Sequence, residues 1–476
     1  MSHALETETA PKLRPTRFDM VILTVIAVVI AAILLTIALG DRIGVTLGRV
    51  APLGVAHSTS PIVIEFSEPM NRASAEARLR LEPAVTGQFV WSGRSLAFRP
   101  DNALTPGAAY TVILEAGAVG ESGRQVLSEH RFSFTVRTPR IAYMYPADGY
   151  PQNVWIVDPA EPGSAQQITQ SPTGIYDFAV SPDGTQLAFA EKNDITGTND
   201  IKLLDLDSGA LIQLTNCVDA SCTTPVWRPD GEMIAYERVD YNTGLDVGSS
   251  PTRIWLLDLT TIPATTRPLF ADTQLIGYNA QWSDDGARIA LYDNTAGAIL
   301  VYDFNDDSIL AVSTYAGTSG SLSPDGTRLI YPDVTLIEGQ GTRSYLLLAE
   351  LDSGAQTNLS SPDDPIEDGR ALWNPDGTQI ALARRYQDER HTRGYQVYIM
   401  DPQTAEVDPV TDDPRYANQF FWWDPTGTQL VLQRFPELDE NMQPNIMGRP
   451  EIWTADLVSG ELTLIAENGF LPRWVP

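Results

Sequence analysis

The most conspicuous feature of the hydrophobic pattern is an unbroken apolar run near the N-terminus. Met20–Leu39 contains no charged side chain, and Thr24 and Thr36 are its only polar side chains. Twenty helical residues rise by ~1.5 Å each and cover ~30 Å, the thickness of the hydrocarbon core of a bilayer. The run therefore predicts one transmembrane helix over residues 18–40.

The charges beside this run predict its orientation. The basic residues of the N-terminal tail all precede it: Lys12, Arg14 and Arg17. Because basic flanks stay on the cytoplasmic side, we expect a cytoplasmic tail over residues 1–17 and a single-pass protein of the cell membrane with residues 41–476 extracytoplasmic. A cleaved signal peptide is the alternative. Its apolar region is usually ~7–15 residues long and ends at a small-residue site, which Ala38-Leu39-Gly40 matches only weakly.

Beyond the run, apolar and polar positions alternate in short segments that are separated by turn residues. Over residues 55–138, segments such as Pro61-Ile-Val-Ile-Glu-Phe-Ser67 and Arg131–Val136 follow this pattern. About six short strands in ~80 residues predict a β-sandwich, joined to the membrane helix by a linker over residues 41–54. Tyr110 follows a tight turn at a strand start, the position of a tyrosine corner.

Residues 139–476 repeat one phrase, in which an apolar residue precedes a Pro-Asp-Gly-type turn and a second apolar strand. The six versions begin at Val180, Trp227, Trp282, Leu322, Trp373 and Trp423. Proline fixes φ, aspartate caps the backbone and glycine permits a positive φ, so the phrase predicts a hairpin. A second phrase, as in Ile201-Lys-Leu-Leu-Asp-Leu-Asp-Ser-Gly209, supplies a third strand and its turn. A period of ~40–50 residues with strand chemistry is typical of propeller blades.

The two ends of this region together make one more repeat. Arg140–Tyr145 matches the second strand of a blade and Asn153–Asp158 the third, but no first strand precedes them. Phe470–Pro476 matches the missing strand and places Trp474 at its aromatic position. We therefore predict an all-β fold: a seven-bladed β-propeller whose C-terminal strand closes blade 1, an N-terminal Ig-like β-sandwich and one transmembrane helix.

Charge excludes one class of partner. The net charge is −29, and residues 140–476 carry nineteen basic and forty-nine acidic groups. Nucleic-acid binding needs a basic surface, so we expect no nucleic-acid partner. Most of the acidic excess is expected to keep an exposed β protein soluble.

Cys217 and Cys222 are the two cysteines of the chain. They are close enough in sequence to form one small disulfide loop in an oxidising compartment, which agrees with an extracytoplasmic location. Two buried free thiols are the alternative. Zinc is disfavoured because no second cysteine pair or histidine pair completes a tetrahedral site.

Motifs that carry catalysis are missing from the sequence. Gly317-Thr-Ser-Gly-Ser321 lacks the last glycine of a nucleophile elbow, and Gly339-Gln-Gly341 lacks the third glycine of a dinucleotide loop. Asp303–Asp307 falls on a hairpin and lacks the glycine and glutamate of a calcium loop. The four histidines are scattered. We expect no catalytic residue, no cofactor and no metal site.

The binding site of a propeller is expected where its long loops gather. Three residues before the aromatic position, each inner strand should reach the channel mouth on that face. The polar residues at this position are the candidate binding residues: Asp177, Thr224, Asn279, Ser319 and Arg370. The other two strands carry Phe420 and Leu471 there.

Two stretches resemble known families. Ile64-Glu-Phe-Ser-Glu-Pro-Met-Asn71 and Trp91-Ser-Gly-Arg-Ser-Leu-Ala-Phe-Arg-Pro-Asp101 resemble the bacterial Ig-like domain of the S-layer type, which implies a spacer or adhesion module over residues 55–138. The Trp-x-Pro-Asp-Gly repeats resemble the TolB-like propeller family over residues 140–476. That resemblance implies protein binding, or a non-catalytic propeller beside a peptidase domain. TolB itself has six blades, so the number predicted here departs from it.

These observations predict a membrane-anchored, extracytoplasmic binding or scaffold protein, whose propeller loop face engages a cell-envelope protein or polymer. The alternative is a propeller-type enzyme, a glycosidase or lyase, that uses carboxylates at the channel mouth. Among the seven mouth positions only Asp177 is acidic, and we therefore expect no enzyme.

Overall fold

The computed structural model describes residues 17–40, 44–101, 103–245, 247–337, 341–361 and 363–476. Nearly all of the predicted cytoplasmic tail, residues 1–16, lies outside these ranges, as do residues 41–43 of the predicted linker. The helix α1 (Arg17–Gly40) covers the apolar run. Within the described ranges, no helix combines the length and the apolarity that a membrane span requires.

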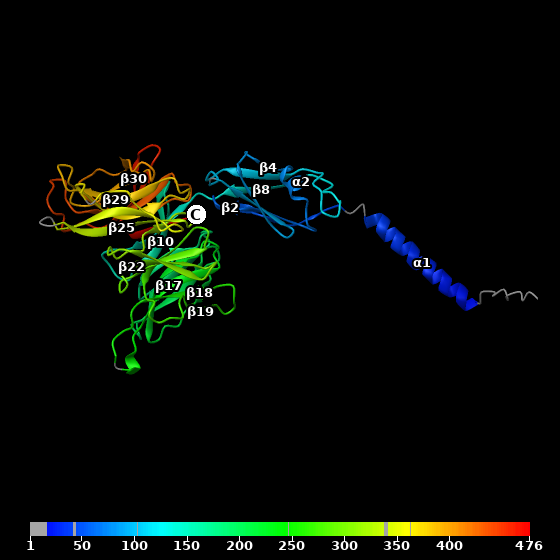
Figure 1. Ribbon diagram of the computed structural model, residues 1–476, viewed down its shortest axis with the longest axis horizontal. Coiled ribbons are helices and arrows are strands. Elements are labelled where there is room, and N and C mark those ends of the chain that lie inside the picture. Colours follow the sequence, from blue (N-terminus) through cyan, green and yellow to red (C-terminus); the bar gives the residue numbers. More distant parts are fainter. Residues whose placement is uncertain (1–16, 41–43, 102, 246, 338–340, 362) are drawn as a thin grey trace, which may run out of the picture. The chain divides into compact units, whose positions relative to one another are not determined.

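The chain separates into two compact units (Figure 1). The first comprises Met1–Gly54, Pro61–Asp101 and Ala109–Phe134; the second comprises Val55–Ser60, Asn102–Ala108 and Thr135–Pro476.

The first β region contains two four-stranded antiparallel sheets, with the orders β1–β3–β6–β5 and β2–β8–β7–β4. Their elements are β1 (Leu47–Ala51), β2 (Gly54–Ala56), β3 (Ile62–Phe66), the short helix α2 (Arg72–Glu76), β4 (Leu79–Glu82), β5 (Gly87–Ser92), β6 (Ser95–Pro100), β7 (Ala109–Leu114) and β8 (His130–Val136). Alternation in the sequence becomes alternation in burial, since Ile62, Ile64 and Phe66 of β3 are fully buried. Two sheets with such faces form the predicted sandwich.

The predicted linker over residues 41–54 is wrong in its second half. Val50 and Ala51 of β1 pair with Ile64 and Val63 of β3, so this β region includes Leu47–Ala51 and does not begin at residue 55. The segment Leu-Gly-Arg-Val-Ala is half-exposed along most of its length. It therefore lacks the alternation that marked the other strands.

The second β region, from residue 140 onward, forms seven four-stranded antiparallel sheets within the described residues. The first has the order β36–β9–β10–β11, and the other six each contain four consecutive strands. The strands are β9 (Arg140–Tyr145), β10 (Asn153–Asp158), β11 (Glu161–Gln167); β12 (Ile175–Val180), β13 (Gln186–Lys192), β14 (Asn199–Asp205), β15 (Leu211–Gln213); β16 (Ala220–Trp227), β17 (Met233–Asp240), β18 (Arg253–Asp258), β19 (Thr265–Pro268); β20 (Tyr278–Trp282), β21 (Arg288–Asp293), β22 (Ala298–Asp303), β23 (Ser308–Ser313); β24 (Ser321–Leu322), β25 (Arg328–Ile337), β26 (Gly341–Glu350), β27 (Gln356–Asn358); β28 (Ile366–Trp373), β29 (Ile380–Tyr386), β30 (Gln396–Met400), β31 (Val407–Pro409); β32 (Tyr416–Trp423), β33 (Gln429–Pro436), β34 (Glu451–Asp456), β35 (Leu462–Glu467); and β36 (Phe470–Val475).

The sheets follow one another around an axis. The first strand of each sheet contacts the first strand of the next, in the cycle β12, β16, β20, β24, β28, β32, β36 and back to β12. The C-terminal strand is part of this cycle because Arg473, Trp474 and Val475 pair with Ala142, Ile141 and Arg140 of β9. The predicted pairing of the last strand with Arg140–Tyr145 is confirmed.

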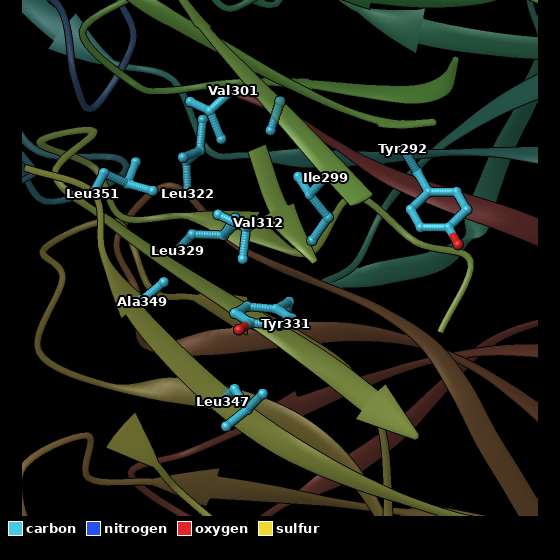
Figure 2. Close-up of a cluster of buried hydrophobic side chains, with 11 residues drawn as sticks. Tyr292, Ile299, Val301, Val312, Leu322, Leu329, Tyr331, Leu347, Ala349 and Leu351 are labelled. Carbon is cyan, nitrogen blue, oxygen red and sulfur yellow. The ribbon is translucent and has the colours of Figure 1, made fainter. Parts of the chain in front are cut away.

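Apolar side chains fill the space between neighbouring sheets. In one such cluster, Ile299, Val301 and Val312 from the sheet of β20–β23 pack with Leu329 and Tyr331 from the next sheet (Figure 2). Each sheet thus buries both faces, which accounts for the continuous apolar runs in its second and third strands.

Tryptophans at the aromatic position form hydrogen bonds between adjacent inner strands. Four of them donate the indole Nε1–H to a main-chain carbonyl of the preceding inner strand at 3.2–3.3 Å: Trp227 to Ala179, Trp282 to Val226, Trp423 to Leu372 and Trp474 to Trp422. Trp474 is only 8% exposed. It is thus buried at the aromatic position that the repeat gives it, and a buried indole keeps its hydrogen bond.

Candidate functional site

The inner strands surround one cavity of about 760 Å³. Its lining repeats from strand to strand in three layers. The mouth layer, three residues before the aromatic position, contains Asp177, Thr224, Asn279, Ser319, Arg370, Phe420 and Leu471; the wall layer, one residue before it, contains Ala179, Val226, Gln281, Ser321, Leu372, Trp422 and Arg473. The turn layer, two residues after it, contains Pro182, Pro229, Asp284, Pro324 and Pro375.

All five candidate binding residues from the sequence lie in this cavity. Asp177, Thr224, Asn279, Ser319 and Arg370 come from five inner strands or the loops that lead into them, and the ring arrangement brings them together. The cavity is large enough for a drug-sized ligand.

The backbone bends where the mouth layer begins. The pairing of β12, β16, β20, β28, β32 and β36 with the second strand of the sheet shifts register at or beside this position. Such a bulge re-aims a side chain. Thr224, Asn279 and Leu471 take the left-handed conformation there, with φ of 53°, 56° and 49°, which costs a non-glycine residue about 1–2 kcal/mol.

Side chains from the preceding sheet hold these three residues in place. Thr224 donates its backbone N–H to Asp177 Oδ2 at 2.7 Å. Asn279 donates to Glu237 Oε1 and Leu471 donates to Gln433 Oε1, both at 2.8 Å. Each strained residue therefore gains a hydrogen bond that links two sheets at the mouth of the cavity.

The acidic side of the mouth consists of Asp177 and Glu237. Burial, with a smaller contribution from the charge of Glu237, raises the pKa of Asp177 to about 7 against the opposing effects of the Thr224 hydrogen bonds and Arg473. Burial also raises the pKa of Glu237. The Oδ1 atom of Asp177 is buried and has no hydrogen-bond partner among the described residues. At neutral pH the Asp177 carboxyl is thus partly protonated and free to donate or accept.

The basic side consists of Arg370 and Arg473, with Trp422 between them in the ring order. The guanidinium carbons of both arginines lie over the Trp422 ring, 4.4 Å and 4.2 Å from its centroid. Burial lowers the pKa of Arg370 to about 10. Burial, followed by the charge of Arg370, lowers the pKa of Arg473 to about 9. Both side chains therefore remain cationic at neutral pH, and stacking on an indole stabilises them.

Asp284 is the acidic residue of the turn layer, at a position where the other six repeats have proline. Burial raises its pKa to about 6, and the neighbouring Asp285 adds to this effect. The cavity thus has a carboxyl group at the end remote from the mouth layer.

Four residues of the candidate site were missed from the sequence: Glu237, Asp284, Gln433 and Arg473. Each had a signal in the repeat. Glu237 and Gln433 occupy the position after the second-strand motif, where other repeats have Met144, Ala190, Tyr292, Pro332 or Ala383. Asp284 replaces the turn proline, and Arg473 is the charged member of its layer. A charged or amide side chain at a position that is mostly apolar in the sister repeats marks the site.

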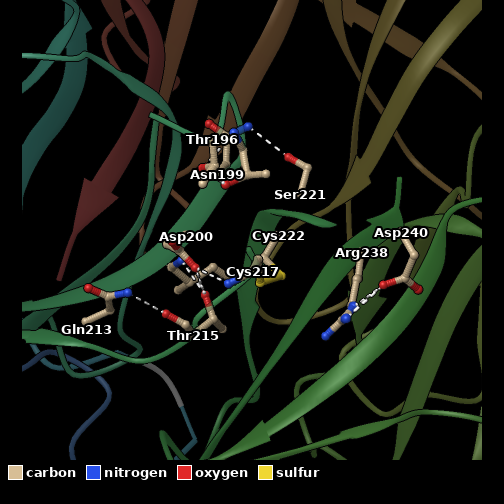
Figure 3. Close-up of a disulfide and its surroundings, with 12 residues drawn as sticks. Thr196, Asn199, Asp200, Gln213, Thr215, Cys217, Ser221, Cys222, Arg238 and Asp240 are labelled. Atoms are coloured by element: carbon tan, nitrogen blue, oxygen red, sulfur yellow. Dashed lines mark hydrogen bonds and ion pairs between the residues drawn. A yellow bond between two sulfur atoms is a disulfide. The ribbon is translucent and has the colours of Figure 1, made fainter. Parts of the chain in front are cut away.

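The structure joins Cys217 and Cys222 in a disulfide (Figure 3). Both cysteines are buried, in and just after the connection from β15 to β16. The backbone N–H of Cys217 donates to Asp200 Oδ1 at 2.6 Å. Neither cysteine lines the cavity, so the disulfide braces the connection between two sheets.

No group of three or more His, Cys, Asp or Glu side chains in the described ranges is arranged to hold a metal ion. Within Asp303–Asp307, Asp303 accepts the backbone N–H of Asn305 at 2.8 Å and an ion pair from Arg288 at 2.8 Å. These partners are those of a hairpin turn.

Two family matches identify the units. Residues 44–136 match the bacterial Ig-like domain, and residues 137–297 match the N-terminal β-propeller domain of prolyl oligopeptidase. No curated protein matches the chain. Residues 44–136 are therefore an Ig-like domain, and a propeller-type domain follows them. The S-layer type of the latter stays a prediction.

Similar solved structures include propellers of several kinds. One is an oligogalacturonate lyase in complex with manganese, 14% identical over 63% of this chain and 75% of that chain, with a TM-score of 0.40. TolB from Acinetobacter baumannii is 18% identical over 71% and 83%, with a TM-score of 0.40. The β-propeller domain of the Trilobed protease from Pyrococcus furiosus is 14% identical over 76% and 93%, with a TM-score of 0.45.

Proposed function

We propose that the protein is a membrane-anchored, extracytoplasmic binding or scaffold protein whose seven-bladed propeller receives part of a cell-envelope protein or polymer at the mouth of its cavity. The observation that carries this proposal is the mouth layer itself. Polar and cationic side chains from five inner strands or their loops converge on one cavity, and Asp177 and Arg370 keep buried polar atoms without partners in the described residues. Convergent, unpaired polar groups in a concave site are the mark of a ligand site.

The anchor rests on the uncharged run Met20–Leu39 in the sequence. Deleting residues 1–40 should move the protein from the membrane fraction to the soluble fraction in a folded state. A truncated protein that stays with membranes would contradict the anchor. In the anchored protein, the Ig-like domain, as a module of the S-layer type, acts as the spacer between the membrane and the propeller.

Site-specific photocrosslinking tests the binding face. A photoreactive residue at Tyr176, which is 62% exposed beside Asp177 on β12, should capture an envelope component in intact cells. The matched control is Ile212, 57% exposed on the outer strand β15 of the same sheet. Adducts at both positions alike, or at neither, would contradict binding at the mouth.

A propeller-type enzyme, a glycosidase or lyase, is the second candidate. It is favoured by the raised pKa of Asp177 near neutrality, which suits a general base or acid. The test is turnover of a panel of acidic and neutral polysaccharides. Turnover that is lost in Asp177→Asn and kept in the control variant Tyr176→Phe, at the neighbouring position, would favour the enzyme over the binding protein.

A further inference from the structure

We propose that Arg370 and Arg473 form a binding site for an oxyanion, a carboxylate or phosphate group carried by a ligand in the cavity. This inference rests on the proposed binding function and names the charged group that the cavity recognises.

Both guanidinium groups have N–H donors available for a ligand. Each lies over the face of Trp422, and this leaves the N–H edges of a guanidinium group free for acceptors in its own plane. Nε and Nη2 of Arg370 have no hydrogen-bond partner among the described residues. Arg473 donates Nη1–H to the carbonyl of Pro472 at 2.9 Å.

Two arginines near Arg370 differ from it because each has a carboxylate partner. In the same sheet as Arg370, Arg384 is paired with Asp368 at 2.7 Å and Arg385 is paired with Glu367. The ion pairs of the described residues include neither Arg370 nor Arg473. Two cations in one cavity repel each other, and a buried cation is normally paired.

Carboxylates are not scarce in this protein, because the net charge is −29. The acidic residue nearest in the ring, Asp177, uses one carboxyl oxygen to accept the backbone N–H of Thr224. An external oxyanion would supply the missing counter-charge, and guanidinium forks bind carboxylate and phosphate groups in a bidentate manner.

The rest of the lining defines the body of the ligand. Elsewhere in the lining, Thr224, Asn279 and Ser319 offer uncharged hydrogen-bonding groups, whereas Phe420 and Trp422 offer aromatic surface. This combination fits a neutral polar body with one oxyanion group at its end.

Isothermal titration calorimetry of the full chain tests the site. The protein is kept in a non-ionic detergent at low ionic strength, and succinate and inorganic phosphate are titrated as separate probes. At least one probe should bind, and added salt should weaken its binding. The probe that binds more tightly assigns the carboxylate or the phosphate. Arg370→Gln and Arg473→Gln should each weaken binding at least about tenfold, and the double variant should abolish it.

The matched control is Arg267→Gln, which removes the same charge from an exposed position on the outer strand β19. It should bind as the wild type does. Thermal unfolding of each variant shows whether it is folded, and Arg370→Lys, which keeps the charge without the fork, should retain only part of the affinity.

Two results would overturn the site: no binding of either probe, or equal affinity in the wild type and both glutamine variants. Because crosslinking at Tyr176 tests the proposed function separately, a crosslink without oxyanion binding would reject the arginine site and leave the binding function standing. Oxyanion binding without a crosslink would reject the envelope ligand and keep the site.

Discussion

Arg384 and Arg370 lie in the same sheet of the propeller, but the side chains around them differ. Arg384 on β29 lies opposite Asp368 on β28 in the strand register, and its Nε and Nη2 donate to Oδ1 and Oδ2 at 2.7 and 2.8 Å. Ser360 donates to the same carboxylate at 2.6 Å. Arg370 falls in the bulge two residues further along β28, where the chain turns its side chain to the cavity.

The difference separates a structural charge from one that is kept for a ligand. Around Arg384 every oxygen of the facing carboxylate has a donor, so the charges of the pair cancel within the fold. Around Arg370 and Arg473 the described residues supply an indole face and no carboxylate partner. Removing a partner should therefore be costly in the first region, whereas removing the cation should cost little in the second.

The largest effect is expected from Asp368→Ala. This change leaves Arg384 buried without its counter-charge, which should lower the free energy of unfolding by about 3–5 kcal/mol. Thermal unfolding of the full chain in detergent would show the loss as a large fall in Tm. The control is Asp388→Ala, which breaks the surface pair of half-buried Asp388 and exposed Arg390 and should lower Tm far less. Equal effects of the two changes would contradict the structural role of the buried pair.

Asp177→Asn tests the acidic side of the cavity through pH. The pKa of Asp177 is about 7 in the folded state and 3.8 in its ordinary range. Since the folded state holds the proton more tightly, its contribution to stability is full below about pH 4 and is lost as pH rises through about 7.

The size of this contribution is on the order of 4 kcal/mol. Asparagine keeps an acceptor for the N–H of Thr224 but does not ionise. The variant should therefore have the same free energy of unfolding as the wild type at about pH 4 and a higher one at about pH 8. Parallel pH profiles of Tm for the two proteins would show that Asp177 ionises normally.

The disulfide stabilises the connection between two neighbouring sheets. The hydrogen bonds of Asp368 and Ser360 lie at the corresponding connection of a later pair of sheets. Thr215 accepts the backbone N–H of Ile201 in one link, and Ser360 accepts that of Leu346 in the other, both at 2.8 Å. Replacing both Cys217 and Cys222 by serine releases a short loop and should cost about 2 kcal/mol. Urea unfolding of the full chain measures this loss, and peptide mass spectrometry without reduction checks the pairing. Two free thiols in the wild type would rule out the disulfide.

Several of these features were accessible from the sequence because repeats make each position comparable with its sisters. The Trp-x-Pro-Asp-Gly phrase predicted the inner hairpins, and the unmatched Arg140–Tyr145 predicted the partner of the last strand. The mouth layer followed from counting back three residues from the aromatic position. Position along a strand is a local property that a repeat preserves.

What the sequence did not reveal depends on contacts between repeats. Arg473 is meaningful only beside Trp422 and Arg370, which precede it by 51 and 103 positions in the numbering. Glu237 acts through the backbone of Asn279 in the next sheet. The strand Leu47–Ala51 was missed for another reason, because its exposed middle removes the alternation on which strand prediction depends.

The smallest expected effect is that of Arg370→Met, and its sign is the informative quantity. Methionine fills much of the same volume and contacts Trp422 without a charge. Loss of the stacking of the cation on the indole costs about 0.5–1 kcal/mol, whereas removal of an unpaired, buried cation and of its repulsion with Arg473 gains a similar amount or more. Without ligand, the variant should thus unfold within about 1 kcal/mol of the wild type or above it. Arg384→Met, the matched change in the paired region, should lose stability because it strands Asp368. If Arg370→Met instead lowers Tm as far as Arg384→Met does, Arg370 is a structural residue of the sheet and the contrast between the two arginines fails.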